Sequence, residues 1–239
     1  MRIIDHDGSL GENIRAAVEA AQSELDPEYL AFTSCDILPD LEELAVIAAD
    51  IRRHQPFDFW MPHIPVTESD ERLGSSAWKP TYPMRPPGAP AVVQTLPGHL
   101  VIGALDSIRF EFVYRLFGLF YETRNSSVAR RRYDVVRGML LHLLREDLQA
   151  LFAGRMPYAI ATVLTQGLKV AASLLRRDAA TQDLEDQIRK VCMTREHRRL
   201  FPTRRGRIAV IDVLSFARDI DTEEEARELT DAGHESSAA

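Results

Sequence analysis

The chain has 239 residues, of which 45% are hydrophobic and 27% are charged, close to the average for folded domains. This composition excludes a disordered, collagen-like or disulfide-stapled chain. The two cysteines, Cys35 and Cys192, are far apart and form no CxxC metal or redox motif. No apolar run reaches the roughly 18 residues of a membrane span, and the N-terminus has no apolar signal segment, so we expect a cytoplasmic protein without a membrane partner.

The net charge of −7 is unevenly distributed along the chain. Residues 1–75 carry a net charge of −11, residues 76–207 carry +11 and residues 208–239 carry −7. This polarity suits a site in which carboxylates hold a metal and arginines face phosphates, and it equally suits solvated helix faces. The arginine clusters of the middle segment belong to no nucleic-acid-binding motif and the chain is acidic overall, so we expect no nucleic-acid partner.

The first sixty residues alternate between strand and helix patterns. A predicted helix at 10–25 has a capping box, because Ser9 precedes it and Glu12 follows three residues later. The predicted elements in this part are strands at 2–4, 29–33 and 57–61 and helices at 10–25 and 41–54. Alternation on this scale is typical of βαβ units and a mainly parallel sheet.

The rest of the chain is predominantly helical. A proline-rich loop at 66–90 leads to predicted strands at 91–95 and 100–102. Predicted helices follow at 108–121, in a basic-flanked segment that ends at 152, at 157–175 and at 184–192. The last predicted elements are a strand at 207–213 and a helix at 222–230. We predict a single α/β domain over residues 1–231, with three layers, a mainly parallel (mixed) sheet and a helical insertion at about 108–200. Residues 232–239 are predicted to be a disordered tail.

Acidic side chains follow two of the predicted strands. Asp36 stands at the carboxyl end of an apolar strand, where ligands bind in open α/β sheets, and carboxylates are the ligands that Mg²⁺ prefers. Asp219 and Asp221 would face the same way in an extended segment. Each has a simpler interpretation, Asp36 as a turn residue before a helix and Asp221 as a helix cap. The sequence therefore predicts a metal site shared by Asp36, Asp219 and Asp221 only if the folded chain brings the two acidic segments together.

Two glycine-containing segments could line a ligand. Ser9, Gly11 and Asn13 stand at a helix N-terminus, whose free N–H groups can face an anion, and the same segment is equally a capped turn. Gly98 would allow a close backbone approach to a ligand, and His99 beside it is a candidate ligand or a structural histidine. The chain has no Ser-His-Asp order and no HExxH motif, so a hydrolase has no support in the sequence.

In order along the chain, these segments resemble the nucleotidyltransferase family related to the enzyme that makes molybdopterin guanine dinucleotide. The resemblance rests on Gly8-Ser9-Leu10-Gly11-Glu12-Asn13-Ile14, Phe32-Thr33-Ser34-Cys35-Asp36-Ile37, Pro97-Gly98-His99-Leu100, Gly154-Arg155-Met156-Pro157 and Asp219-Ile220-Asp221-Thr222. It implies a GT-A-like domain that transfers a nucleotidyl group from a nucleoside triphosphate to a phosphorylated or hydroxyl small-molecule acceptor, with Mg²⁺ and release of pyrophosphate.

The resemblance also implies roles for individual residues. Asp36, as the main catalytic residue, would hold the metal together with Asp219 and Asp221, and Ser9, Gly11 and Asn13 would lie near the base and ribose. Gly98 and His99 would line the acceptor pocket, where relatives have Gly-Asn. Relatives also carry a glycine-rich loop that wraps the triphosphate, ahead of the strand that resembles residues 2–4.

The sequence contains no such glycine-rich loop. Phosphoryl transfer depends on positive groups around the leaving pyrophosphate, so the missing loop leaves two hypotheses. The chain is either an N-terminally truncated form of a nucleotidyltransferase or a non-catalytic nucleotide- or protein-binding module derived from that family. A homodimer could cover the strand edges and apolar helix faces that the missing strand would leave.

Overall fold

The structure is a computed structural model that describes residues 9–25, 27–67, 72–73, 79–123, 126–220, 223 and 227. The predicted strand at 2–4, the predicted tail at 232–239 and nearly all of the predicted helix at 222–230 lie outside these residues.

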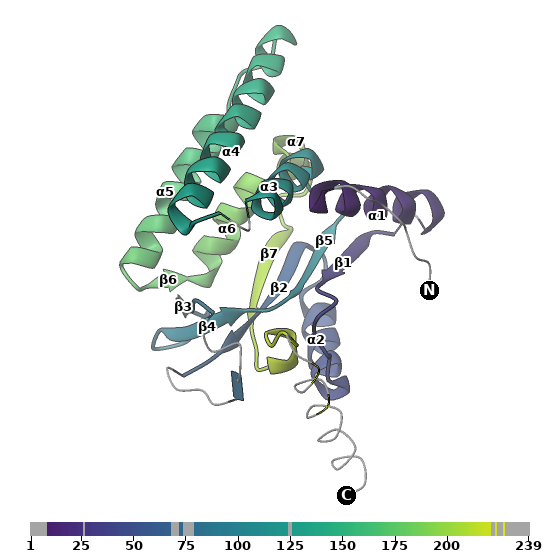
Figure 1. Cartoon of the computed structure of the whole chain (residues 1–239), viewed down its shortest axis with the longest axis vertical. Helices are drawn as coiled ribbons and strands as arrows, with labels where there is room; N and C mark the ends of the chain where they lie inside the picture. The colour runs from purple at the N-terminus through teal and green to yellow at the C-terminus, as the bar shows by residue number, and fades with distance from the viewer. Residues whose placement is uncertain are drawn as a thin grey trace, which may run out of the picture.

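The described chain is a mixed α/β structure, as predicted (Figure 1). Its elements are α1 (Leu10–Leu25), β1 (Tyr29–Thr33), α2 (Leu41–His54), β2 (Phe57–Pro65), β3 (Tyr82–Arg85), β4 (Val93–Pro97), β5 (Leu100–Ala104), α3 (Phe110–Glu122), α4 (Val128–Phe152), α5 (Ala159–Leu175), β6 (Ala179–Ala180), α6 (Thr181–Cys192), α7 (Arg195–Leu200), β7 (Arg205–Val210) and the 3₁₀ helix η2 (Leu214–Phe216). The predicted bounds of α1, β1 and α2 are confirmed. The sequence pattern missed β3, β6 and α7, which are short.

The sheet is mixed, and the prediction that it is mainly parallel was wrong. Its strands are ordered β1-β5-β2-β4-β3-β6, with β7 also pairing with β2. Among the strand pairs of the described residues, β2–β7 and β3–β6 are parallel, whereas β1–β5, β2–β5, β2–β4 and β3–β4 are antiparallel. Sequence periodicity predicts where a strand lies but not in which direction it runs relative to its neighbours. Here β4 and β5 run antiparallel to β2.

β4 and β5 form one kinked strand along β2 rather than a hairpin. Trp60 pairs with Ile102 and His63 pairs with Pro97, so an advance of three residues along β2 corresponds to five residues along the chain from β5 back to β4. The two extra residues are accommodated at the kink that contains Gly98, whose N–H donates to the carbonyl of Pro62 at 2.9 Å. A bulge of this kind bends a strand and re-aims its side chains. The kink therefore sends β4 toward β3 and β5 toward β1.

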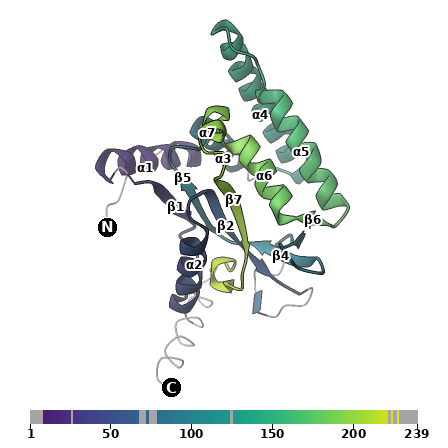
Figure 2. The ribbon, with the colours of Figure 1, turned by 180° about the vertical axis from the view of Figure 1, so that it is seen from behind.

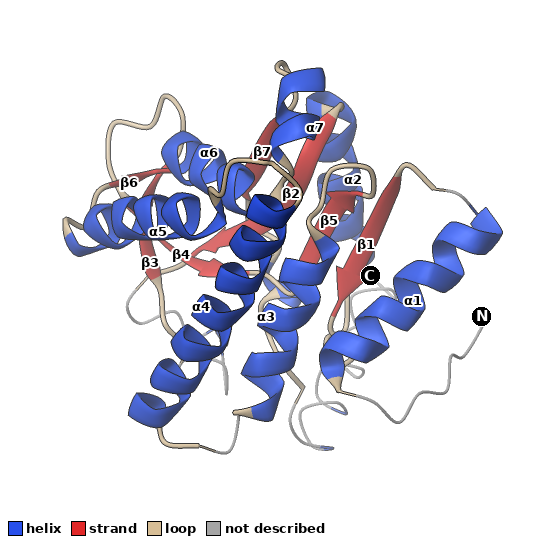
Figure 3. Ribbon diagram, turned by 90° about the horizontal axis from the view of Figure 1, so that it is seen from above, coloured by secondary structure: helices blue, strands red, loops and turns tan. Residues whose placement is uncertain are grey.

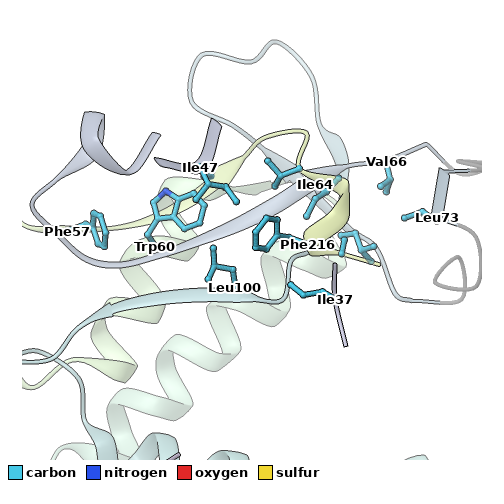
Figure 4. Close-up of a cluster of buried hydrophobic side chains, with 13 residues drawn as sticks. Ile37, Ile47, Phe57, Trp60, Ile64, Val66, Leu73, Leu100 and Phe216 are labelled. Carbon is cyan, nitrogen blue, oxygen red and sulfur yellow. The ribbon is translucent and has the colours of Figure 1, made fainter. Parts of the chain in front are cut away.

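Helices cover both faces of the sheet, giving the predicted three layers. On one face α2 and η2 pack on β2 through Ile47, Trp60, Ile64 and Phe216, which belong to the largest apolar cluster (Figure 4). On the other face α6 packs on β2 and β7 in a cluster that includes Phe59, Leu184 and Ile208.

The helices between β5 and β7 build a third apolar cluster from α3, α4 and α5. Figures 2 and 3 show α1, α3 and α4 together at one end of the molecule, with α5 and α6 beside them. Between residues 110 and 200 the regular elements are helices, apart from the short strand β6. The carboxylate of Asp147 on α4 caps α5, because it accepts hydrogen bonds from the N–H groups of Tyr158, Ala159 and Ile160 at 2.7–3.0 Å.

Candidate functional site

The carboxyl ends of β1, β2 and β7 lie at one edge of the sheet. β1 and β2 both run against β5, and β7 runs parallel to β2, so the three strands point the same way. The segments that leave them meet at this edge: the N–H of Ile220 donates to the carbonyl of Asp36 at 2.8 Å. The kink in the β4–β5 strand joins them, because the N–H of His99 donates to the carbonyl of Phe216 at 2.6 Å and the N–H of Ser34 donates to the carbonyl of His99 at 3.3 Å.

Four polar side chains gather here, and we call them the edge cluster: Asp36, Lys79, His99 and Asp219. Three of these were singled out in the sequence, but Lys79 was not. Its ammonium nitrogen lies 2.7 Å from Oδ2 of Asp219, 2.9 Å from Nε2 of His99 and 2.9 Å from the carbonyl oxygen of Ala217. An ammonium has three N–H donors, so these contacts can use all of them.

His99 lies between a cation and an anion. Its Nε2 is 2.9 Å from Lys79 and also 2.9 Å from Oδ1 of Asp219. Burial lowers the pKa of His99, Lys79 lowers it further, and the carboxylates of Asp219 and Asp36 oppose the change. The ring is therefore neutral at neutral pH. A neutral ring either accepts from Lys79 or donates to Asp219 through Nε2, so its tautomer decides which neighbour it bonds.

Asp36 is the exposed carboxylate of the edge cluster. The hydroxyl of Ser34 donates to its Oδ1, and this hydrogen bond is the main reason why the pKa of Asp36 lies below its usual value. His99 and Lys79 lower that pKa as well. Asp36 is therefore an ionised carboxylate that faces solvent beside a buried cation.

Apolar neighbours of the cluster residues in sequence are part of the main core. Ile37, Leu100 and Phe216, each next to or near a cluster residue in sequence, belong to one buried apolar cluster (Figure 4). η2 is also tied to the start of α2: Glu43 accepts from the backbone N–H of Ser215 at 2.9 Å and from its hydroxyl, and that hydroxyl accepts from the N–H of Asp40 at 3.1 Å. These contacts fix the segment that leads to Asp219.

The structure separates Ser9, Gly11 and Asn13 from the edge cluster. Ser9 and Glu12 form the predicted capping box, with Ser9 N–H donating to Glu12 at 2.7 Å. α1 packs on α3, which follows the other end of β5. Gly11 is buried in this contact, and a Cβ at this position would lie 2.3 Å from the carbonyl oxygen of Tyr114. Close helix packing therefore explains this glycine.

Gly98 also has a packing role, since a Cβ there would lie 2.8 Å from the side chain of Pro62. Its neighbour His99 does join the edge cluster. Asp221 lies outside the described residues, so its position relative to Asp36 is not described.

The residues of the edge cluster fit Mg²⁺ in one specific way. Asp219 is largely buried, with Oδ2 paired to Lys79 and Oδ1 2.9 Å from Nε2 of His99, whereas Asp36 is exposed and faces solvent. Among the described residues, no group of three or more His, Cys, Asp or Glu side chains is arranged to hold an ion. Mg²⁺ commonly takes only one or two protein carboxylates and fills its other positions with water and substrate phosphates. The donor set therefore suits a cation that arrives with phosphates.

A second ionic cluster is closed to ligands. Asp58 lies at a register shift between β2 and β7, is fully buried, and pairs with Arg189 and with Nε2 of His197 at 2.7 Å. Arg189 also donates to the carbonyl of Phe201 at 2.7 Å. These contacts join α6 and α7 to the sheet.

The chain matches no protein-family model, no curated protein and no solved structure. Within the described part of the chain, none of the helices is both long enough and apolar enough to cross a bilayer.

Proposed function

We propose that the edge cluster binds the phosphates of a nucleoside triphosphate with Mg²⁺, and that the chain is a nucleotidyltransferase-like protein with a GT-A-like sheet. The observation that carries the proposal is the meeting of Asp36 and Asp219, which are 183 residues apart in sequence but joined by the hydrogen bond from Ile220 to Asp36. Asp36 follows the carboxyl end of β1, and Asp219 lies on the segment that leaves β7 through η2. Ligands of α/β sheets bind outside such carboxyl ends.

The charges of the cluster suit a bound phosphate–metal pair. Asp36 would hold the cation through its solvent-exposed carboxylate. Mg²⁺ would supply positive charge that stabilises the negative charge of the phosphate oxygens. Lys79 places a second positive charge within the same cluster. Asp219 is a positioning residue in this account, because its carboxylate holds Lys79 and His99 rather than the cation.

His99 suits the acceptor side of the proposed reaction. Its ring is neutral near neutral pH. In the tautomer whose Nε2–H donates to Asp219, Nδ1 can take a proton from an acceptor hydroxyl, and Asp219, 2.9 Å from Nε2, would stabilise the resulting imidazolium. The acceptor oxygen would attack the α-phosphorus, the bond to the bridging oxygen would break, and pyrophosphate would leave. A phosphorylated acceptor needs no proton removal, and His99 would then only orient it.

Pyrophosphate release tests the catalytic proposal. The full chain is incubated with Mg²⁺, each of the four ribonucleoside triphosphates and a panel of sugar phosphates and alcohols. We expect release with at least one pair and its loss in Asp36→Ala. The matched control is Asp106→Ala, since Asp106 pairs with Arg204 and follows the other end of β5. Equal release by Asp36→Ala and the parent protein would refute the role of Asp36.

A non-catalytic nucleotide-binding module is the second candidate, because the edge cluster provides a single cationic side chain, Lys79, toward a triphosphate. Nucleotide binding that depends on Asp36 but releases no pyrophosphate with any acceptor would favour it.

A further inference from the structure

The hairpin of α4 and α5 has an apolar surface that no described part of the chain covers. α4 packs on α3 through Met139 and Leu143, and α5 packs toward α6 through Val170 and Leu174. Other large apolar side chains of both helices remain exposed. The residues of this surface, which we call the hairpin face, are Tyr133, Val136, Leu140, Leu144, Leu148 and Leu151 on α4 and Leu164, Leu168 and Leu175 on α5.

The spacing of these residues is helical. On α4 they recur every three or four residues over five turns, and on α5 Leu164, Leu168 and Leu175 share one line at spacings of four and seven. Phe152 and Met156, at the turn between the helices, are 90% and 78% exposed. Figure 1 shows α4 projecting beyond the sheet, so this end of the hairpin is accessible. Exposed apolar surface of this extent marks an interaction site.

The exposed charges of the hairpin all have one sign. Among the described residues from Val128 to Leu175, the exposed charged side chains are Arg130, Arg132, Arg137, Arg145, Arg155 and Lys169. The three acidic side chains there are half-buried: Asp147 caps α5, Glu146 pairs with Arg109 and Asp134 pairs with Arg130. Arg130 and Arg137 are seven residues apart, and on a helix they fall on the same line as Leu144 and Leu148 of the hairpin face.

We infer that the hairpin face docks on the surface of an anionic lipid bilayer. Exposed apolar side chains beside exposed Lys and Arg, with no exposed acidic side chain described among them, are the features of helices that lie in the interface of an anionic bilayer. A second copy of the chain is disfavoured, because two such hairpins would bring like charges together. This differs from our expectation of no membrane partner, which rested on the absence of a spanning segment. A helix that lies on a bilayer needs no spanning length. The inference is independent of the proposed nucleotide site.

Vesicle co-sedimentation of the full chain tests this inference. We expect the protein to sediment with vesicles that contain phosphatidylserine and phosphatidylcholine, to remain in solution with phosphatidylcholine alone, and to be released by salt. Arg137→Gln should weaken binding about fivefold, the usual effect of one basic group at an anionic surface. Leu168→Gln should weaken it roughly tenfold, since Leu168 is 72% exposed and its burial in lipid is lost.

Matched controls come from α2, on the other face of the sheet. Leu41→Gln and Arg52→Gln replace an exposed leucine and an exposed arginine there and should leave binding unchanged. Equal melting temperatures would establish that each variant is folded. Three results would overturn the inference: no sedimentation with phosphatidylserine vesicles, equal sedimentation with phosphatidylcholine alone, or a dimer in sedimentation velocity that Leu168→Gln dissociates, which would assign the hairpin face to a second copy.

Discussion

The ammonium nitrogen of Lys79 lies 2.7 Å from Oδ2 of Asp219, although 140 residues separate them in sequence. Both side chains are largely buried, with 10% and 16% of their surfaces exposed. The pair joins the segment that leads into β3 to the segment that follows β7. It therefore holds together two loops that the sheet alone leaves unconnected.

Lys79→Met should destabilise the protein by about 1–3 kcal/mol, because it leaves a largely buried carboxylate without its cation. It should also weaken nucleotide binding by removing positive charge beside Asp36. Chemical denaturation measures the first effect and calorimetric titration the second. Lys190→Met is the control, since Lys190 forms only an exposed pair with Asp186 on α6 and should cost under about 0.5 kcal/mol. Equal losses in the two variants would contradict the structural role of Lys79.

Stability should fall in acid because of His63 on β2. Burial lowers its pKa to about 4, well below the value of about 6.5 expected in the unfolded chain. The unfolded state therefore binds the proton more readily. Neutral His63 therefore contributes to the free energy of unfolding in full above pH 6.5. As the pH falls from 6.5 toward 4 this contribution is lost, which lowers the free energy of unfolding by on the order of 3 kcal/mol. The pKa values of His99 and His142 are also lowered by burial and act in the same direction.

His63→Gln should make the dependence of stability on pH shallower over this range. Denaturant unfolding at several pH values between 4 and 7 gives the slope directly. An unchanged slope in the variant would mean that His63 does not titrate on unfolding.

Gly11→Ala should destabilise the protein by about 1–3 kcal/mol, because its methyl group would meet the carbonyl oxygen of Tyr114. Gly167→Ala on α5 should instead stabilise by up to about 1 kcal/mol, since nothing lies within 4 Å of the added atom and alanine is the better helix former. Thermal unfolding of the two variants compares them. If the position of Gly11 is explained by packing alone, nucleotide affinity should be the same in Gly11→Ala and the parent protein at a temperature where both are folded.

Asp147→Ala should cost about 1–2 kcal/mol through loss of the α5 cap. Its carboxylate serves three N–H groups, whereas Asp134 on the same helix makes only a pair with Arg130 at 3.6 Å. Asp134→Ala is thus the matched control and should change the free energy of unfolding by less than about 0.5 kcal/mol. A cost for Asp134→Ala as large as that for Asp147→Ala would contradict the capping role.

The sequence predicted the elements of this fold better than their arrangement. Helix periodicity and the capping box at Ser9 are local, so α1 and α2 were predicted with their correct bounds. The direction of β5 depends on its pairing with β1 and β2, which local periodicity does not encode. Gly98 and His99 stood between two separately predicted strands, at 91–95 and 100–102, and only the pairing with β2 shows that these strands form one kinked strand.

The candidate site was predicted in part for the same reason. Asp36 and His99 stand beside strand ends, and this position is visible in the sequence. Lys79 stands in a proline-rich segment with no motif, and only the folded chain brings it to Asp219. Conversely, Gly11 at a helix start looked like part of a ligand loop, whereas the structure uses it for contact with α3.

Calorimetric titration of nucleoside triphosphates, with and without Mg²⁺, tests the central claim that the edge cluster binds a phosphate–metal pair through Asp36. We predict binding of at least one nucleotide that requires Mg²⁺ and weakens about tenfold or more in Asp36→Asn, since a lost charged contact is worth at least about 1.4 kcal/mol. Asp106→Asn should bind like the parent protein. Binding of the same strength without Mg²⁺ or in Asp36→Asn, or no binding at millimolar nucleotide, would contradict the account.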